Sequence, residues 1–132
     1  MPELTLRSER RCELIDVTDE VAATLADLAV RDGGLLVSSP HTTAGVIVNE
    51  GYDPDVAGDL LRRLERLAPH EGQGDRHDEG NSDSHLKVAL VGSAALVPVS
   101  AGELRLGRWQ RIFFCEFDGP RTRSLHVTPL AG

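Results

Sequence analysis

The sequence has few aromatic residues, two cysteines, one lysine and no long apolar run. No apolar stretch approaches the roughly 18 residues of a membrane-spanning helix, so a helical membrane protein is excluded. Cys12 and Cys115 lie in strand-like apolar segments, which predicts reduced, buried thiols and no disulfide framework. The N-terminal stretch MPELTLRSERR carries no apolar segment after its charges. We therefore expect no secretory signal and a cytoplasmic location.

Positive charge is also scarce. The chain has 21 acidic and 14 basic residues, and its formal net charge is -7. Because nucleic-acid binding draws its affinity from clustered Lys and Arg, such a partner is disfavoured, and no membrane partner is indicated. The 132 residues with 40% apolar content are typical of one soluble globular domain, which we expect to span 1–132.

Short apolar segments bounded by Gly, Pro and charged residues predict strands along most of the chain. The first two, at 3–7 and 12–17, are expected to form a hairpin across the charged turn from Ser8 to Arg11. The remaining strands are predicted at 34–39, 44–50, 95–99, 103–107, 108–119 and 122–130.

Helical periodicity predicts two longer helices and one short helix. The first would be capped by Thr18 and run about 13 residues, and the second would begin at Asp53-Pro54 and end at Ala68. The short helix would be capped by Asn81 or Ser82 and direct Leu86, Ala89 and Leu90 inward. Together the elements predict an α+β fold with a largely antiparallel sheet.

The loop at 70–83 has no aliphatic residue and is expected to be exposed. His41, His77 and His85 occur in a turn, in this loop and at a helix start, where side chains are free to converge on one site. Three imidazoles suit a divalent metal, zinc in particular, although their spacing of 36 and 8 matches no local zinc motif. They would equally bind a phosphate or act as general acid and base. Residue type alone leaves both alternatives open.

Groups suited to anions lie in the same segments. Candidates that would grip phosphate oxygens are Thr42, Thr43, Ser84, Lys87, Arg121 and Arg123. The carboxylates expected nearest to the site are Glu50, Glu116 and Asp118. They would pair with arginines, orient a histidine or help to hold a metal.

The segments HTTAGVIVNEG, DVAGDLLRRLERLAP, HLKVALVG and VPVSAGELRLGRWQRIFFCEFDGPRTR resemble the YjbQ family, which is often labelled secondary thiamine-phosphate synthase. The likeness runs from about residue 10 to 128, in order and with matching spacing. Arg76 and Ser84 depart from the family pattern.

The resemblance implies a compact α+β homotrimer with sites near subunit boundaries. It implies a cluster of His41, His77 and His85 with neighbours Glu50, Asn81, Lys87, Glu116 and Arg121. The family activity joins hydroxymethylpyrimidine diphosphate to a thiazole phosphate with release of diphosphate, as a side activity. Such a transfer needs a cationic environment for the departing diphosphate, usually a divalent metal with Lys or Arg.

Two further functions stay open from the sequence. Three imidazoles and a carboxylate would also suit a metal-dependent hydrolase of a small phosphorylated metabolite. A trimer that binds an anion or metabolite without converting it would need the same residues.

Overall fold

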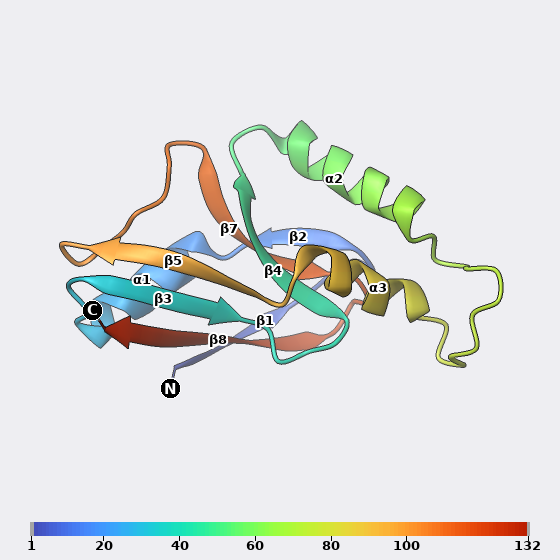
Figure 1. Ribbon diagram of the computed structural model, residues 1–132, viewed down its shortest axis with the longest axis horizontal. Coiled ribbons are helices and arrows are strands. Elements are labelled where there is room, and N and C mark those ends of the chain that lie inside the picture. Colours follow the sequence, from blue (N-terminus) through green and yellow to red (C-terminus); the bar gives the residue numbers. More distant parts are fainter. Residues whose placement is uncertain (1, 132) are drawn as a thin grey trace.

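The computed structural model describes residues 2–131 of the chain. These residues form three helices and strands in two sheets (Figure 1). The elements in chain order are β1 (Glu3–Arg7), β2 (Glu13–Asp16), α1 (Thr18–Leu28), β3 (Gly33–Ser38), β4 (Ala44–Glu50), α2 (Pro54–Leu67), α3 (Ser82–Val91), β5 (Ala94–Ser100), β6 (Glu103–Leu104), β7 (Gln110–Glu116) and β8 (Thr122–Ala131). The predicted α+β class, with antiparallel pairing, is confirmed.

The strands divide between a five-stranded sheet, in the order β1-β8-β3-β5-β6, and a three-stranded sheet, in the order β2-β7-β4. The predicted hairpin of the first two strands is therefore wrong, because β1 pairs with β8 and β2 pairs with β7. The segment between them follows the β7–β8 turn from one sheet to the other. Ser8 N donates to Arg121 O at 3.0 Å, and Gly119 N donates to Arg11 O at 3.0 Å. Pairing with the longer C-terminal strands thus replaces the local hairpin.

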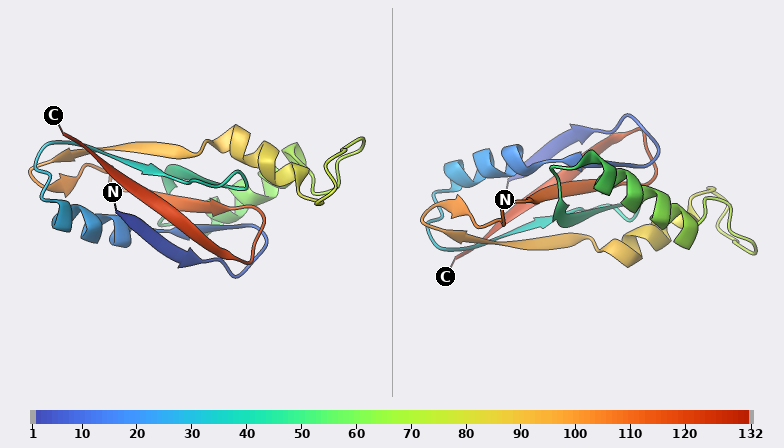
Figure 2. Two further views of the ribbon diagram at one scale, coloured as in Figure 1. Left: turned by 90° about the horizontal axis from the view of Figure 1, so that it is seen from below. Right: turned by 90° about the horizontal axis from the view of Figure 1, so that it is seen from above.

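One apolar core lies between the sheets. Val37 and Val127 enter it from the five-stranded sheet, and Val46 and Phe114 enter it from the three-stranded sheet. Helix α1 contributes Val21 and Leu25, both buried. In the two views of Figure 2, α1 lies at one end of the molecule and the loop before α3 projects from the opposite end.

Helix α1 has a different N-terminus from the predicted one. Val17 is the N-cap residue, and the Thr18 hydroxyl instead accepts a hydrogen bond from Ile112 N at 2.8 Å, which ties the helix to β7. The helix ends at Leu28 after 11 residues, shorter than the predicted length of about 13, because Ala29 adopts a left-handed conformation with φ of 56°.

Helix α2 begins as predicted, with the Asp53 carboxylate accepting from Asp55 N and Pro54 at its first position. None of its residues is fully buried, and Leu67 is 69% exposed. Its apolar side therefore covers the sheet incompletely. No helix in the part of the chain that the structure describes is long and apolar enough to cross a membrane.

Helix α3 shows the opposite face from the predicted one. Leu86 and Leu90 are exposed, whereas Asp83, Ser84 and Lys87 are buried. The inward face of α3 is polar because it meets charged side chains from α2 and from the segment before β2. The end of α3 also touches β4 closely, since a Cβ on Gly45 would lie 2.4 Å from Gly92 O. A side chain at residue 45 would push this helix away.

Two C-terminal strands are shorter than predicted. The segment 103–107 forms only the two-residue β6, and the segment 108–119 forms a strand only over β7. The residues after β7 turn toward β8 through a cis Gly119-Pro120 bond. This turn supplies several side chains of the site described below.

Candidate functional site

The structure contains a cavity of about 410 Å³, and the loop before α3 that helps to form it lies at the end of the molecule away from α1 (Figure 2). The cavity is formed by the β3–β4 turn, the loop before α3, the first turns of α3, and the β7–β8 turn. Its lining residues are Pro40, His41, Thr42, Thr43, His77, Glu79, Asn81, His85, Asp118, Arg121 and Arg123. The segments predicted to converge thus meet in one place.

Strand pairing brings these turns together. Ala44, the first residue of β4, pairs with Glu116, the last residue of β7. Phe117 N then donates to Thr43 O at 3.2 Å, which holds the two turns side by side. The Ser39 hydroxyl donates to Ala44 O at 2.8 Å and accepts from His41 N at 3.1 Å, which closes the β3–β4 turn.

His41 is fixed by the backbone of β8. Ser124 N donates to His41 Nε2 at 2.9 Å, and the imidazole contacts the Phe114 ring edge-on at 6.5 Å between centroids. Burial lowers the pKa of His41 below its ordinary value, and the positive charge of Arg123 lowers it further. His41 is therefore held in the neutral form at neutral pH.

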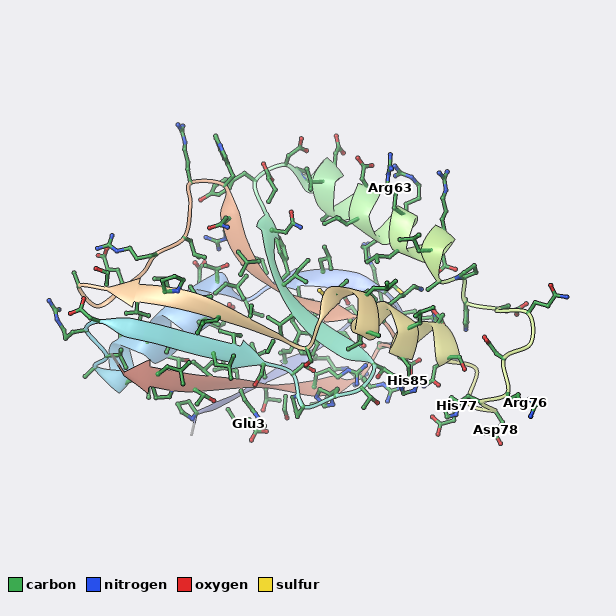
Figure 3. The ribbon with its side chains drawn as sticks, viewed as in Figure 1. Glu3, Arg63, Arg76, His77, Asp78 and His85 are labelled. Atoms are coloured by element: carbon green, nitrogen blue, oxygen red, sulfur yellow. The ribbon has the colours of Figure 1, made fainter. Side chains whose placement is uncertain are left out.

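His77 and His85 form a second imidazole group. Their rings meet edge to face, with centroids 5.4 Å apart. His77 Nε2 lies 3.9 Å from Glu79 Oε2. Figure 3 shows His85 on the lower side of α3 and His77 close to Arg76 and Asp78 in the lower part of the loop before this helix. His77 is 41% exposed, so this part of the cavity is open to solvent.

Arg123 reaches the cavity wall from β8 and is almost fully buried. Its guanidinium donates to both oxygens of Glu116, to Thr43 Oγ1 at 2.9 Å and to Thr43 O at 3.3 Å. Ser8 Oγ also donates to Glu116 Oε1 at 2.6 Å. Burial alone would raise the pKa of Glu116, but these hydrogen bonds hold it below its ordinary value. Glu116 therefore supports the wall from behind as a carboxylate.

Asp118 links the other two sides of the cavity. It accepts from Asn81 Nδ2 at 2.8 Å and from Arg121 Nη2 at 2.8 Å, and its backbone oxygen accepts from Arg121 Nε at 2.8 Å. Because a carboxylate only accepts, the amide nitrogen of Asn81 must face Asp118. Asn81 Oδ1 is buried and has no hydrogen-bond partner among residues 2–131. Arg121 is half exposed, so part of its guanidinium remains accessible.

Four predicted site residues do not line the cavity. Glu116 stands behind its wall, and Ser84 is buried with its hydroxyl donating to Phe117 O at 2.6 Å. Glu50 accepts from Tyr52 N at 2.8 Å and from Asp53 N at 2.9 Å, at the far end of β4, where it shapes the turn before α2. Lys87 is buried on the inward face of α3, where it donates to Glu65 at 2.7 Å and to Asp83 at 2.8 Å.

Several lining groups are not among the predicted binding residues. Asp118 is expected from the sequence only as a nearby carboxylate, and Glu79 only as part of a solvated loop. The amide of Ser124 that orients His41 carries no sequence signal, because every residue except proline has the same N–H group. Only the pairing of β1, β8 and β3 determines where that amide lies.

The three-histidine metal site predicted from the sequence does not fit this geometry. Among residues 2–131, no three His, Cys, Asp or Glu side chains are grouped so that they could hold a metal ion. His41 Nε2 already accepts from Ser124, so its lone pair is not free for a metal. Of the three predicted ligands, only His77 and His85, with ring centroids 5.4 Å apart, lie close enough together to be considered as two ligands of one metal ion.

The fold and cavity define a class of protein: a two-sheet α+β protein with a polar cavity lined by histidines and arginines at one end. Residues 2–132 match the family model described as UPF0047 protein YjbQ-like. The chain belongs to this family.

Similar proteins cover nearly the whole chain. UPF0047 protein YugU of Bacillus subtilis is 48% identical over 94% of this chain and 94% of its own. A crystal structure of an uncharacterized YjbQ/UPF0047 protein from Clostridium acetobutylicum is 41% identical, with a TM-score of 0.96 over 98% of this chain and 100% of that chain. A conserved hypothetical protein from Thermus thermophilus is 44% identical, with a TM-score of 0.91 over 98% of this chain and 100% of that chain.

Proposed function

We propose that the cavity binds a small phosphorylated metabolite and that the protein is a cytoplasmic transferase similar to thiamine-phosphate synthase. It would join hydroxymethylpyrimidine diphosphate to a thiazole phosphate and release diphosphate, as a side activity. The observation that carries the proposal is the convergence of His41, His77, His85, Arg121 and Arg123 on one cavity. These are the side chains that proteins use to bind phosphate oxygens.

The size of the cavity supports a small ligand. Its volume of about 410 Å³ falls within the roughly 300 to 1,000 Å³ of small-molecule sites. Pro40 is the one apolar residue in its lining, which favours a charged group over an apolar ring. The phosphate part of the substrate is therefore expected to lie deepest in this cavity.

The charge balance supports a site that binds phosphate by hydrogen bonds. Arg121 is paired with Asp118 and Arg123 with Glu116, so each arginine charge is already opposed by a carboxylate. What remains for a ligand are N–H groups of the accessible guanidinium of Arg121 and the imidazoles. Hydrogen bonds to an anion are about twice as strong as those between neutral groups.

In the proposed transfer, the bond from the pyrimidine methylene carbon to the diphosphate oxygen breaks while the thiazole nitrogen bonds to that carbon. Negative charge develops on the leaving diphosphate. Arg121 would stabilise this charge electrostatically, and His77 or His85 would donate a hydrogen bond to the leaving oxygen.

A turnover assay with both substrates tests the proposal. We expect product from the wild type, and a rate reduced by about 100-fold or more in His85→Ala, since general acid groups contribute roughly 10²–10⁴-fold. The matched control is His126→Ala, because His126 lies on β8 outside the cavity lining. Equal rates for wild type and His85→Ala would remove His85 from the mechanism.

A second candidate is a metal-dependent hydrolase of a phosphate ester. The closeness of His77 and His85 favours it, because this pair would be the one to hold a divalent ion such as zinc. A panel of phosphate esters, assayed with added zinc or manganese, separates it from the transferase. A ligand that co-purifies and is never converted would instead favour a non-catalytic metabolite-binding protein.

We also propose that the protein acts as a homotrimer. The exposed apolar residues on its helices, Leu67 on α2 and Leu86 and Leu90 on α3, support an interface between copies. Light scattering after size-exclusion chromatography would give the trimer mass, and a monomer mass would contradict the proposal.

A further inference from the structure

We infer that His41 serves the cavity as a neutral hydrogen-bond donor to an anionic oxygen of the ligand, through Nδ1–H, and that it is not a metal ligand. This inference deepens the proposed function and rests on it, since it assigns a role within the same site. It separates His41 from His77 and His85, which the sequence placed in one cluster.

The geometry fixes the tautomer. Ser124 N carries a proton and lies 2.9 Å from His41 Nε2, so Nε2 must offer a lone pair. A neutral imidazole with an unprotonated Nε2 carries its proton on Nδ1. The opposite ring assignment would place a C–H group against the Ser124 amide and leave that amide without an acceptor.

Nδ1 is the accessible nitrogen of His41. No hydrogen-bond partner for it is found among residues 2–131, and Asn81 Oδ1 is the one buried and unpartnered side-chain polar atom in this range. His41 Nδ1 is not among the buried atoms without a partner, so this nitrogen is accessible to solvent or to a ligand. His41 lines the cavity, so a ligand there meets an N–H donor.

The surroundings hold His41 in this form. Protonation of Nε2 would set two N–H groups against each other at 2.9 Å. Burial and the charge of Arg123 lower the pKa of the imidazole, which acts in the same direction. Arg123 itself cannot turn away, because Glu116 and Thr43 hold its guanidinium.

A metal ion at His41 would need an imidazole lone pair directed at the ion. The one lone pair of this tautomer is used by Ser124, and the accessible Nδ1 carries a proton. An oxyanion has the opposite requirement, because it needs donors. His41 therefore selects for an anion at its end of the cavity.

The tautomer is tested by long-range ¹H–¹⁵N NMR on the ¹⁵N-labelled protein near neutral pH. We expect His41 to show a protonated Nδ1 and an unprotonated Nε2, with assignment by comparison with His41→Asn. A protonated Nε2, or protons on both nitrogens, would overturn the inference.

Binding of inorganic pyrophosphate, measured by calorimetry, tests the donor role. His41→Ala removes the N–H and should weaken binding by about 10- to 100-fold, as expected for a hydrogen bond to a charged group. His41→Asn keeps an amide N–H near the position of Nδ1 and should retain most of the affinity. His126→Asn is the matched control and should bind like the wild type. Equal loss in His41→Ala and His41→Asn would contradict the donor role.

A separate zinc titration completes the test. We expect the zinc affinity of His41→Ala to equal that of the wild type, whether zinc binds strongly or weakly. A tenfold or larger loss of zinc affinity would make His41 a metal ligand and overturn the inference. If the wild type binds no pyrophosphate, the proposed anion site fails, while the NMR result still decides the tautomer of His41 independently.

Discussion

Two buried polar networks, one on the inward face of α3 and one behind the cavity wall, use the same residue types for different roles. Beneath the helix, Lys87 pairs with Asp83 and Glu65, and Arg11 donates to Asp83 at 2.9 and 3.1 Å. At the cavity, Arg123 pairs with Glu116. In the first network the charged groups pair with one another and border no part of the cavity. The second network lies directly behind the cavity wall. A buried ion pair thus identifies a binding site only when it borders an accessible space.

The largest effect is expected from breaking the network on the inward face of α3. Lys87→Met removes one cation and leaves Asp83, which is fully buried, with Arg11 alone. We expect the free energy of unfolding to fall by about 3 kcal/mol, because removing one partner leaves a buried charge poorly compensated. Urea denaturation measures the change. Arg62→Met, which breaks an exposed pair with Asp59, is the control, and an equally small change in both variants would contradict the assignment.

Acid should weaken both networks. Hydrogen bonds hold the pKa values of Asp83 and Glu116 below the ordinary values of 3.8 and 4.5, although burial opposes this. The folded state then binds fewer protons than the unfolded state, so this stability is fully present above the ordinary values. It is lost as pH falls below about 4.5 and through the lowered values of the folded state.

Urea unfolding at a series of pH values measures this loss. We expect Glu116→Gln to be less stable than the wild type at neutral pH and to show a shallower decline in acid, since one titrating carboxylate is gone. Parallel pH profiles for the two proteins would show that Glu116 does not contribute.

An intermediate effect is expected from Arg121, on ligand binding and not on stability. Arg121→Ala should weaken pyrophosphate binding by about tenfold, as expected for the loss of a hydrogen bond to a charged group. Its exposed pair with Asp118 should contribute at most about 1 kcal/mol to stability. Calorimetry and urea denaturation separate the two readouts. A large loss of stability with unchanged affinity would place Arg121 with the structural network instead.

The smallest effect is expected at Glu50. Glu50→Gln should leave pyrophosphate affinity unchanged, because the carboxylate serves the backbone of Tyr52 and Asp53 away from the cavity. We expect a loss of stability of about 1 kcal/mol, from weaker hydrogen bonds to two amides. A clear loss of affinity would return Glu50 to the site.

The sequence predicts the parts of the site that depend on local features. Gly, Pro and polar residues mark the turns and loops, so His41, Thr42, His77 and Arg121 are correctly placed in segments that meet. The roles of these residues stay predictions. The second sheet is missed because strand partners are set by distant residues, as in the pairing of β1 with β8.

The predicted orientation of α3 is wrong for a similar reason. Its leucines indicate the inward face in the sequence, since apolar residues usually face the core. The actual inward face depends on Glu65 and Arg11, which come from other parts of the chain and give no periodic signal in α3. The tautomer of His41 is also beyond sequence reasoning, because a backbone amide determines it.

The charged inward face of α3 affects the orientation of the His85 side chain. The ion pairs of Lys87 and Asp83, at 2.7 to 2.9 Å, resist rotation of α3 about its axis, because rotation would separate buried charges. His85 belongs to the same helix, so the ion pairs on the opposite side of α3 also fix the direction in which its imidazole points. Glu65, on a different helix and outside the cavity lining, thereby helps to orient the His85 imidazole that lines the cavity.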